Sequence, residues 1–284
     1  MYNNRDGDDA AALKRFGEPA WNNPVVRFFA PDGRELLQRR DGIWDASRIA
    51  ARMVAALQSA ERRVPAYLTL AADEVSAWRA ERATFAMHCF WQGEAALGGL
   101  EGVLDTRVGW LEGREVVEVH YLPQRLAYDK LLERALAFDC AQRVYAHSDV
   151  QLSAAQKHVG ERAVRTDDVA RDARASDRKW HLQRSALRWL PLTPTQAARI
   201  NSDLAAGRDA LRWLSARQHQ LAARIEDAAP GKTLQTLAPP DVVFGPQASF
   251  ARQVRAAAGR VDYVERLGRY EEDLVTRLMT VESR

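Results

Sequence analysis

Alternating apolar and polar residues predict a set of short β-strands in the middle of the chain. The alternation is clearest where Val117, Val119 and Tyr121 are separated by polar residues, because successive side chains of a strand point to opposite faces of its sheet. Four stretches have this strand character: Thr84–His88, Val103–Trp110, Glu115–Tyr121 and Arg143–Ala146.

Apolar residues spaced three and four positions apart predict helices between these strands. One helix runs through Ala95–Leu100 and is stopped by glycines, and a second runs through Tyr128–Phe138. The resulting order is β-α-β-β-α-β, which is typical of a ferredoxin-like α+β sheet with its helices on one side. The sequence therefore predicts an α+β protein.

The first quarter of the chain has a separate pattern. Residues 1–15 are polar and are predicted to be disordered. Two short apolar runs on either side of Pro-Asp-Gly at residues 31–33 predict a β-hairpin. A helix follows, with Asp45 as its N-cap, and ends before Pro65.

Beyond residue 150 the pattern is mostly helical, and residues 191–284 are expected to form a helical extension. Thr193 followed by Pro194 predicts a helix that continues through Leu204. Residues 231–246 have the composition of a loop. The last predicted helix carries one apolar stripe, which is typical of a packing face and could equally seat a partner chain: Phe250, Val254, Ala257, Val261, Val264, Leu267, Tyr270, Leu274 and Leu278.

Composition and charge argue against a nucleic-acid partner. The chain has 284 residues, 46% of them hydrophobic, which is enough to bury a substantial core. Of its 41 basic residues 36 are arginines, but 38 acidic residues alternate with them and the formal net charge is only +3. A nucleic-acid binder usually gathers its positive charge on one face.

Several further classes of protein are excluded by residue usage. Two cysteines cannot build a disulfide framework or a four-cysteine zinc site. No apolar run approaches the roughly 18 residues of a membrane span, and the absence of an apolar export segment near the N-terminus predicts a cytoplasmic protein with free thiols. Scattered histidines and the lack of a phosphate-binding glycine loop leave no expected metal or cofactor.

Cys89 lies where a predicted strand gives way to a helix, within Ala-Met-His-Cys-Phe-Trp-Gln-Gly-Glu at residues 86–94. A thiol at a helix N-terminus faces unpaired backbone N–H groups and the positive end of the helix dipole, and both stabilise the thiolate. A protonated His88 nearby would act in the same direction. The alternative is a buried cysteine that serves only as a small apolar side chain.

The residues after Cys89 form an ordered series of motifs. Cys-Phe-Trp is followed by Glu94, by Gly-Trp at residues 109–110, by Glu-Val-Val-Glu-Val-His-Tyr at 115–121 and by Tyr-Asp-Lys-Leu-Leu at 128–132. A weaker match follows at residues 177–182. This series resembles the A-type peptide methionine sulfoxide reductases. The resemblance implies a sulfoxide-reductase-like domain at residues 67–190 that acts in protein repair without a cofactor.

The resemblance also implies a role for each residue of the candidate site. Cys89 would attack the sulfoxide sulfur as a thiolate. Phe90 and Trp91 would seat the substrate methyl group. Glu115 would protonate the sulfoxide oxygen, which requires a carboxyl group with a raised pKa. Glu118 is the local competitor, but three residues on along a strand it points to the opposite face, toward solvent if Glu115 faces the site.

Cys140 is the only other thiol of the chain. Attack on a sulfoxide leaves a sulfenic acid on Cys89, with which Cys140 could condense to form a disulfide. The alternative is that Cys140 is a packed thiol. In that case thioredoxin or another thiol reductant would have to reduce Cys89 directly.

The chain departs from the family pattern in ways that leave two function hypotheses open. His88 stands where the family usually has glycine, and two shortened loops lack two tyrosines and an aspartate. Glu115 would then act alone, or with Trp110 or Tyr145 nearby. The first hypothesis is a thiol oxidoreductase acting on a methionine-sulfoxide-containing protein or a small sulfoxide. The second is a catalytically impaired binding or scaffold protein that keeps the fold.

The segment from Pro24 to Leu36 has a second resemblance. It looks like the second half of a thioredoxin-like fold, in which a proline, commonly with a cis peptide bond, precedes a hairpin and a closing helix. The resemblance implies a partial thioredoxin-like segment at residues 16–66, a cis Asn23–Pro24 bond, and a longer ancestral gene of the kind found in thioredoxin-like selenoprotein fusions.

Overall fold

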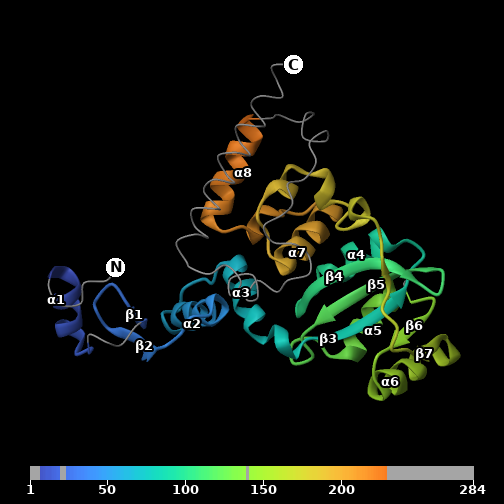
Figure 1. Ribbon diagram of the computed structural model, residues 1–284, viewed down its shortest axis with the longest axis horizontal. Coiled ribbons are helices and arrows are strands. Elements are labelled where there is room, and N and C mark those ends of the chain that lie inside the picture. Colours follow the sequence, from blue (N-terminus) through green and yellow to red (C-terminus); the bar gives the residue numbers. More distant parts are fainter. Residues whose placement is uncertain (1–6, 20–23, 139–140, 229–284) are drawn as a thin grey trace. The chain divides into compact units, whose positions relative to one another are not determined.

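A computed structural model describes residues 7–19, 24–138 and 141–228 (Figure 1). The chain divides into two compact units, with the boundary between Val75 and Ser76. The sequence instead predicts a boundary after residue 66; in the structure the following helix, α3 (Ala66–Asp73), packs against α2 (Ala46–Ser59) of the first unit. Both units combine helices with a sheet, so the predicted α+β class is confirmed.

The first unit contains a hairpin followed by two helices. Strands β1 (Val25–Phe29) and β2 (Glu35–Asp41) pair in antiparallel fashion, as the sequence predicts. The side chain of Asp45 accepts hydrogen bonds from the backbone N–H groups of Ser47 and Arg48 in the first turn of α2, so the predicted N-cap is confirmed. Within residues 1–15, which the sequence predicts to be disordered, residues 1–6 lie outside the described residues, and Gly7–Phe16 forms helix α1. The ring of Phe16 stacks on that of Phe29 with centroids 5.2 Å apart.

The second unit is built on a six-stranded sheet with the order β7-β6-β3-β5-β4-β8. The four central strands pair with one another in antiparallel fashion, and the edge strand β7 pairs in parallel with β6. They appear along the chain in the predicted β-α-β-β-α-β order. The strands of this sheet are β3 (Glu81–Ala86), β4 (Val103–Leu111), β5 (Arg114–Tyr121), β6 (Val144–Ala146), β7 (Ala163–Arg165) and β8 (Arg171–Asp172).

Three helices cover one face of this sheet: α4 (Phe90–Gly98), α5 (Tyr128–Ala137) and α6 (Asp149–Val159). Right-handed crossover connections place all three on the same side. Phe85, Val117 and Val119 of the sheet are fully buried against Leu131 and Leu132 of α5. This apolar layer is the main core of the second unit.

The opposite face carries a strap instead of a helix in the part of the chain that the structure describes. Strands β7 and β8 lie at the two edges of the sheet, and residues 166–170 connect them. Val164 of β7 and Ala170, the last residue of this connection, pack against buried Ala86, Val116 and Tyr145. The rest of this face carries polar and charged side chains, among them Arg82, Arg107 and Glu118.

The helix after Cys89 begins five residues earlier than its apolar spacing predicts, at Phe90 rather than Ala95. Aromatic residues are only moderate helix formers. However, the carboxylate of Glu115 accepts a hydrogen bond from the Phe90 backbone N–H and so satisfies one of the donors that a helix start leaves free. Glu115 lies on β5, 25 residues along the chain, so the local sequence pattern around Phe90 does not reveal where α4 begins.

The described residues beyond 190 belong to the second unit. Thr193 is the N-cap of α7 (Pro194–Ala205), as the sequence predicts, and Gln196 completes a capping box with it. Helix α7 contacts α4 and β4, while α8 (Ala216–Ala228) packs on the segment Ala186–Trp189. The predicted loop at residues 231–246 and the predicted last helix lie outside the described residues. Of the helices described, none has the length and apolar character that crossing a bilayer would demand.

Candidate active site

Cys89 occupies the N-cap of α4, directly after β3 and a two-residue turn. Its backbone is extended (φ −140°, ψ 113°), its carbonyl accepts the first helical hydrogen bond from Gly93, and its thiol is free and half-buried. This is the strand-to-helix position that the sequence predicts for the thiol. The preceding His88 is exposed to solvent.

Glu115 lies at the same helix start. Its Oε2 accepts a hydrogen bond of 2.8 Å from the backbone N–H of Phe90, the residue next to Cys89. The carbonyl of Glu115 also accepts a hydrogen bond of 2.8 Å from the Met87 N–H. The two bonds hold the start of β5 against the turn between β3 and α4. The half-buried side chains of Glu115 and Cys89 therefore both lie at the N-terminus of α4.

The aromatic residues expected to form the substrate seat lie together beside this turn. Phe90 is buried, and its ring meets Trp91 at 6.0 Å and Trp110 edge-on at 5.7 Å between ring centroids. Trp110 is also the direct cross-strand neighbour of Glu115 in the β4–β5 ladder. The indole N–H of Trp91 is buried and has no hydrogen-bond partner among the described residues, so it is a donor that the fold leaves unused.

Tyr145, the other expected neighbour of Glu115, lies on the opposite face of the sheet. Tyr145 pairs with Thr84 in the ladder and is fully buried under the strap. Its hydroxyl donates to Glu112 at 3.1 Å, and burial followed by this hydrogen bond raises the pKa of Tyr145 to about 12. Tyr145 therefore does not assist Glu115, and Trp110 is the aromatic neighbour that remains.

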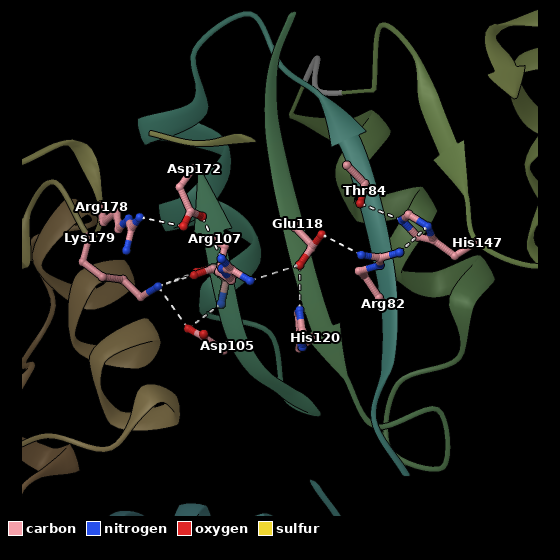
Figure 2. Close-up of polar contacts among 11 residues, drawn as sticks. Arg82, Thr84, Asp105, Arg107, Glu118, His120, His147, Asp172, Arg178 and Lys179 are labelled. Atoms are coloured by element: carbon pink, nitrogen blue, oxygen red, sulfur yellow. Dashed lines mark hydrogen bonds and ion pairs between the residues drawn. The ribbon is translucent and has the colours of Figure 1, made fainter. Parts of the chain in front are cut away.

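Glu118 also lies on the face opposite Glu115, as the alternation predicts, but it does not point into solvent. Its side chain is 5% exposed and lies between Arg82 and Arg107, with His120 donating at 2.9 Å (Figure 2). Burial alone would raise the pKa of Glu118, but His120 and the two arginines outweigh it and hold that pKa below its ordinary value. The expectation of a solvated Glu118 was wrong because long side chains from both neighbouring strands cover it.

These residues belong to a polar network that spans the strap-bearing face. Arg82 continues from Glu118 to His147, and Arg107 continues to Asp172, which also pairs with Arg178 (Figure 2). Each charged side chain of this network therefore contacts at least one other member of it. Among the described residues no cluster of three or more His, Cys, Asp or Glu side chains could hold a metal ion.

Glu94, a member of the motif series, lies on α4 and points into the protein. It is fully buried, and Lys179 donates to it with both its backbone N–H (2.6 Å) and its Nζ (3.0 Å). The Nζ also contacts Asp105 at 3.1 Å (Figure 2). Burial alone would lower the pKa of Lys179, but Asp105 and Glu94 outweigh it and hold that pKa above its ordinary value.

The next residue, Trp180, stacks on Trp91 with ring centroids 3.7 Å apart and an interplanar angle of 17°. Sequence reasoning did not assign a role to Lys179 or Trp180. The only signal was the weak return of the motif series at residues 177–182, because these contacts of Lys179 and Trp180 join segments more than 70 residues apart.

Cys140, the expected second thiol, lies outside the described residues. The neighbouring Ala141 donates its N–H to the carbonyl of Ala86 at 2.9 Å, and Gln142 donates to the same oxygen at 3.2 Å. Ala86 is the last residue of β3, three residues before Cys89. The connection between α5 and β6 therefore returns to the same end of the sheet as Cys89.

The fold and this geometry define a class of site: a thiol at a strand-to-helix turn of an α+β sheet, with a carboxylate and an aromatic group beside it. Comparison with protein-family models gives no match. Among curated proteins the chain is 36% identical to peptide methionine sulfoxide reductase MsrA 1 of Nostoc sp., over 18% of this chain and 42% of that protein.

Two further relatives show the same similarity. The chain is 41% identical to peptide methionine sulfoxide reductase A5 of Oryza sativa subsp. japonica, over 19% of this chain and 26% of that protein. It is 38% identical to peptide methionine sulfoxide reductase MsrA of Geobacter metallireducens, over 18% of this chain and 43% of that protein. The chain spans less than half the length of these relatives. It therefore contains a region similar to the A-type peptide methionine sulfoxide reductases, as its motifs indicate.

Proposed function

We propose that this protein reduces methyl sulfoxides, with Cys89 as the nucleophile and Glu115 as the general acid. The observation that carries the proposal is the 2.8 Å hydrogen bond from the Phe90 N–H to the Glu115 carboxylate, which brings an acid to the helix start that bears the thiol. The similarity to peptide methionine sulfoxide reductases supports the choice of substrate. We include residues 67–190 in the sulfoxide-reductase-like domain and residues 16–66 in a partial thioredoxin-like segment.

The proposed chemistry begins with the Cys89 thiolate. Its sulfur attacks the sulfoxide sulfur while Glu115 gives a proton to the sulfoxide oxygen, and the S–O bond breaks as the oxygen passes to Cys89. The products are a thioether and a cysteine sulfenic acid, so the substrate is reduced by two electrons and Cys89 is oxidised by two. Phe90, Trp91 and Trp110 supply an apolar seat for the methyl group.

The sulfenic acid must then be reduced. The Cys140 thiol would attack it to form a Cys89–Cys140 disulfide with loss of water. The return of Ala141 and Gln142 to the end of β3 supports a short distance between the two segments. Thioredoxin or another thiol reductant would then reduce the disulfide by thiol–disulfide exchange and restore both thiols.

Reduction of a methyl sulfoxide with dithiothreitol as reductant tests this proposal. We expect the wild type to produce the thioether and Cys89→Ser to produce none. Glu115→Gln should lower kcat by roughly 10²–10⁴-fold, the usual contribution of a general acid. Glu118→Gln is the matched control, because it removes a carboxylate from the same strand but from the opposite face of the sheet.

The same assay includes the outcome that would favour a non-catalytic protein. A folded wild type without sulfoxide reduction, in which Cys89 also reacts slowly with an alkylating reagent near pH 7, would contradict the proposal and support a binding or scaffold role. Equal loss of activity in Glu115→Gln and Glu118→Gln would contradict the assignment of the acid.

A further inference from the structure

One face of Trp91 is already covered by a tryptophan that is distant in sequence. Trp180 lies parallel to it at 3.7 Å between ring centroids, a separation of full ring-on-ring contact. Phe90, whose ring lies against that of Trp91, is contacted edge-on by Trp110. A substrate methyl group therefore cannot lie on the Trp180-covered face of Trp91. The four rings form one contiguous aromatic group that begins with the two residues after Cys89.

Trp180 is held in this place by the residue before it. Lys179 has a left-handed backbone conformation (φ +48°), which is unfavourable for a residue with a side chain. Its N–H and its Nζ both donate to buried Glu94, at 2.6 and 3.0 Å, and the Nζ also binds Asp105. These contacts hold both the backbone N–H and the side-chain tip of Lys179. They therefore set the direction in which the side chain of the next residue, Trp180, points.

We infer that Trp180 is a specificity-determining wall of the substrate seat and that Lys179 is the residue that positions it. The wall admits a sulfoxide whose smaller substituent is a methyl group and excludes larger alkyl groups. This inference rests on the proposed function for its substrate class. The limit that the Trp180 ring sets on the size of a molecule reaching Cys89 does not depend on catalysis.

The first test measures access to Cys89 without any turnover. In a Cys140→Ser background Cys89 is the only thiol, and its alkylation rate is measured with small iodoacetamide and with bulky N-phenylmaleimide. Trp180→Ala should raise the ratio of bulky to small rates by roughly tenfold, the discrimination that a close-fitting apolar wall provides. Trp180→Phe retains a ring and should keep the wild-type ratio. An unchanged ratio in folded Trp180→Ala would overturn the inference.

The second test uses turnover of two sulfoxides, methyl p-tolyl sulfoxide and butyl p-tolyl sulfoxide. Trp180→Ala should raise kcat/KM for the butyl compound relative to the methyl compound by roughly tenfold, and Trp180→Phe should not. If the wild type reduces neither sulfoxide but Trp180→Ala changes the alkylation ratio, the proposed function fails and the wall stands. If the wild type is active and neither ratio changes, the wall is overturned and the proposed function stands.

The role of Lys179 is tested by removing the buried charges as a pair. The double variant Lys179→Met with Glu94→Gln removes the fully buried Glu94 carboxylate together with its cation. Of the remaining charges, only the half-buried Asp105 loses a partner, so the variant is expected to fold. It should shift the alkylation ratio in the direction of Trp180→Ala and weaken the circular-dichroism couplet that two stacked indoles produce. A wild-type ratio and a wild-type couplet in this variant would overturn the positioning role.

Discussion

His147 is held in its neutral form by its neighbours. Arg82 donates to its Nδ1 at 3.1 Å, and its Nε2 lies 2.8 Å from the hydroxyl of Thr84. An arginine can only donate, so Nδ1 accepts and the ring proton lies on Nε2. Burial, and then the charge of Arg82, lower the pKa of His147 below its ordinary value of 6.5.

This predicts a dependence of stability on pH. Because the folded-state pKa of His147 is lowered, the unfolded chain binds more protons below pH 6.5, and the free energy of unfolding falls as pH falls through that value. His147→Gln should remove this component. Urea unfolding between pH 7.5 and 5.5 should therefore show a smaller loss of stability in the variant, and parallel profiles would contradict the prediction.

Single residues also show how far the sequence could be interpreted. Alternation along β5 placed Glu115 and Glu118 on opposite faces, which the ladder confirms, because side-chain direction in a strand follows from local geometry. The environment of Glu118 could not be predicted, because the arginines that cover it come from two other strands. The burial of Glu94 by Lys179, 85 residues away, was hidden for the same reason.

At the scale of elements, α7 is attached to the site-bearing helix by one buried side chain. The guanidinium of Arg199 donates to the carbonyl of Gly98 at the end of α4 (2.6 Å) and to that of Val103 at the start of β4 (3.1 Å). Residues 191–284 are expected from sequence to be an extension. Periodicity reveals a helix and its apolar stripe but not the surface on which the helix packs, so this attachment could not be foreseen.

Arg199→Met should therefore destabilise the second unit. Two buried carbonyl acceptors would lose a charged donor, and we expect the free energy of unfolding to fall by about 3 kcal/mol. Urea unfolding followed by tryptophan fluorescence measures the change. Arg162→Met, on the exposed turn after α6, is the control and should stay within about 0.5 kcal/mol of the wild type. Similar losses in the two variants would show that the buried contacts contribute nothing specific.

At the scale of the whole molecule, the described candidate site belongs entirely to the second unit. Cys89, Glu115 and Trp180 all follow the boundary after Val75. The apolar cluster that contains Trp189 and Ile200 extends this unit beyond residue 190, the end of the domain that the motif series predicts. The minimal part that forms the site should then be longer at its C-terminal side than the family resemblance suggests.

Two fragments test this conclusion. A fragment of residues 74–284 keeps the 3₁₀ turn Glu74–Arg79 intact and retains α7, so Cys89 should be alkylated at the same rate as in the full chain. A fragment of residues 74–190 lacks α7 and exposes the surface of α4 on which it packs, where Gly98 lies close to the backbone of Ala198. We expect this shorter fragment to unfold at a lower urea concentration and to lose the selectivity between small and bulky alkylating reagents. Equal stability and equal selectivity of the two fragments would show that residues 67–190 are sufficient for the site.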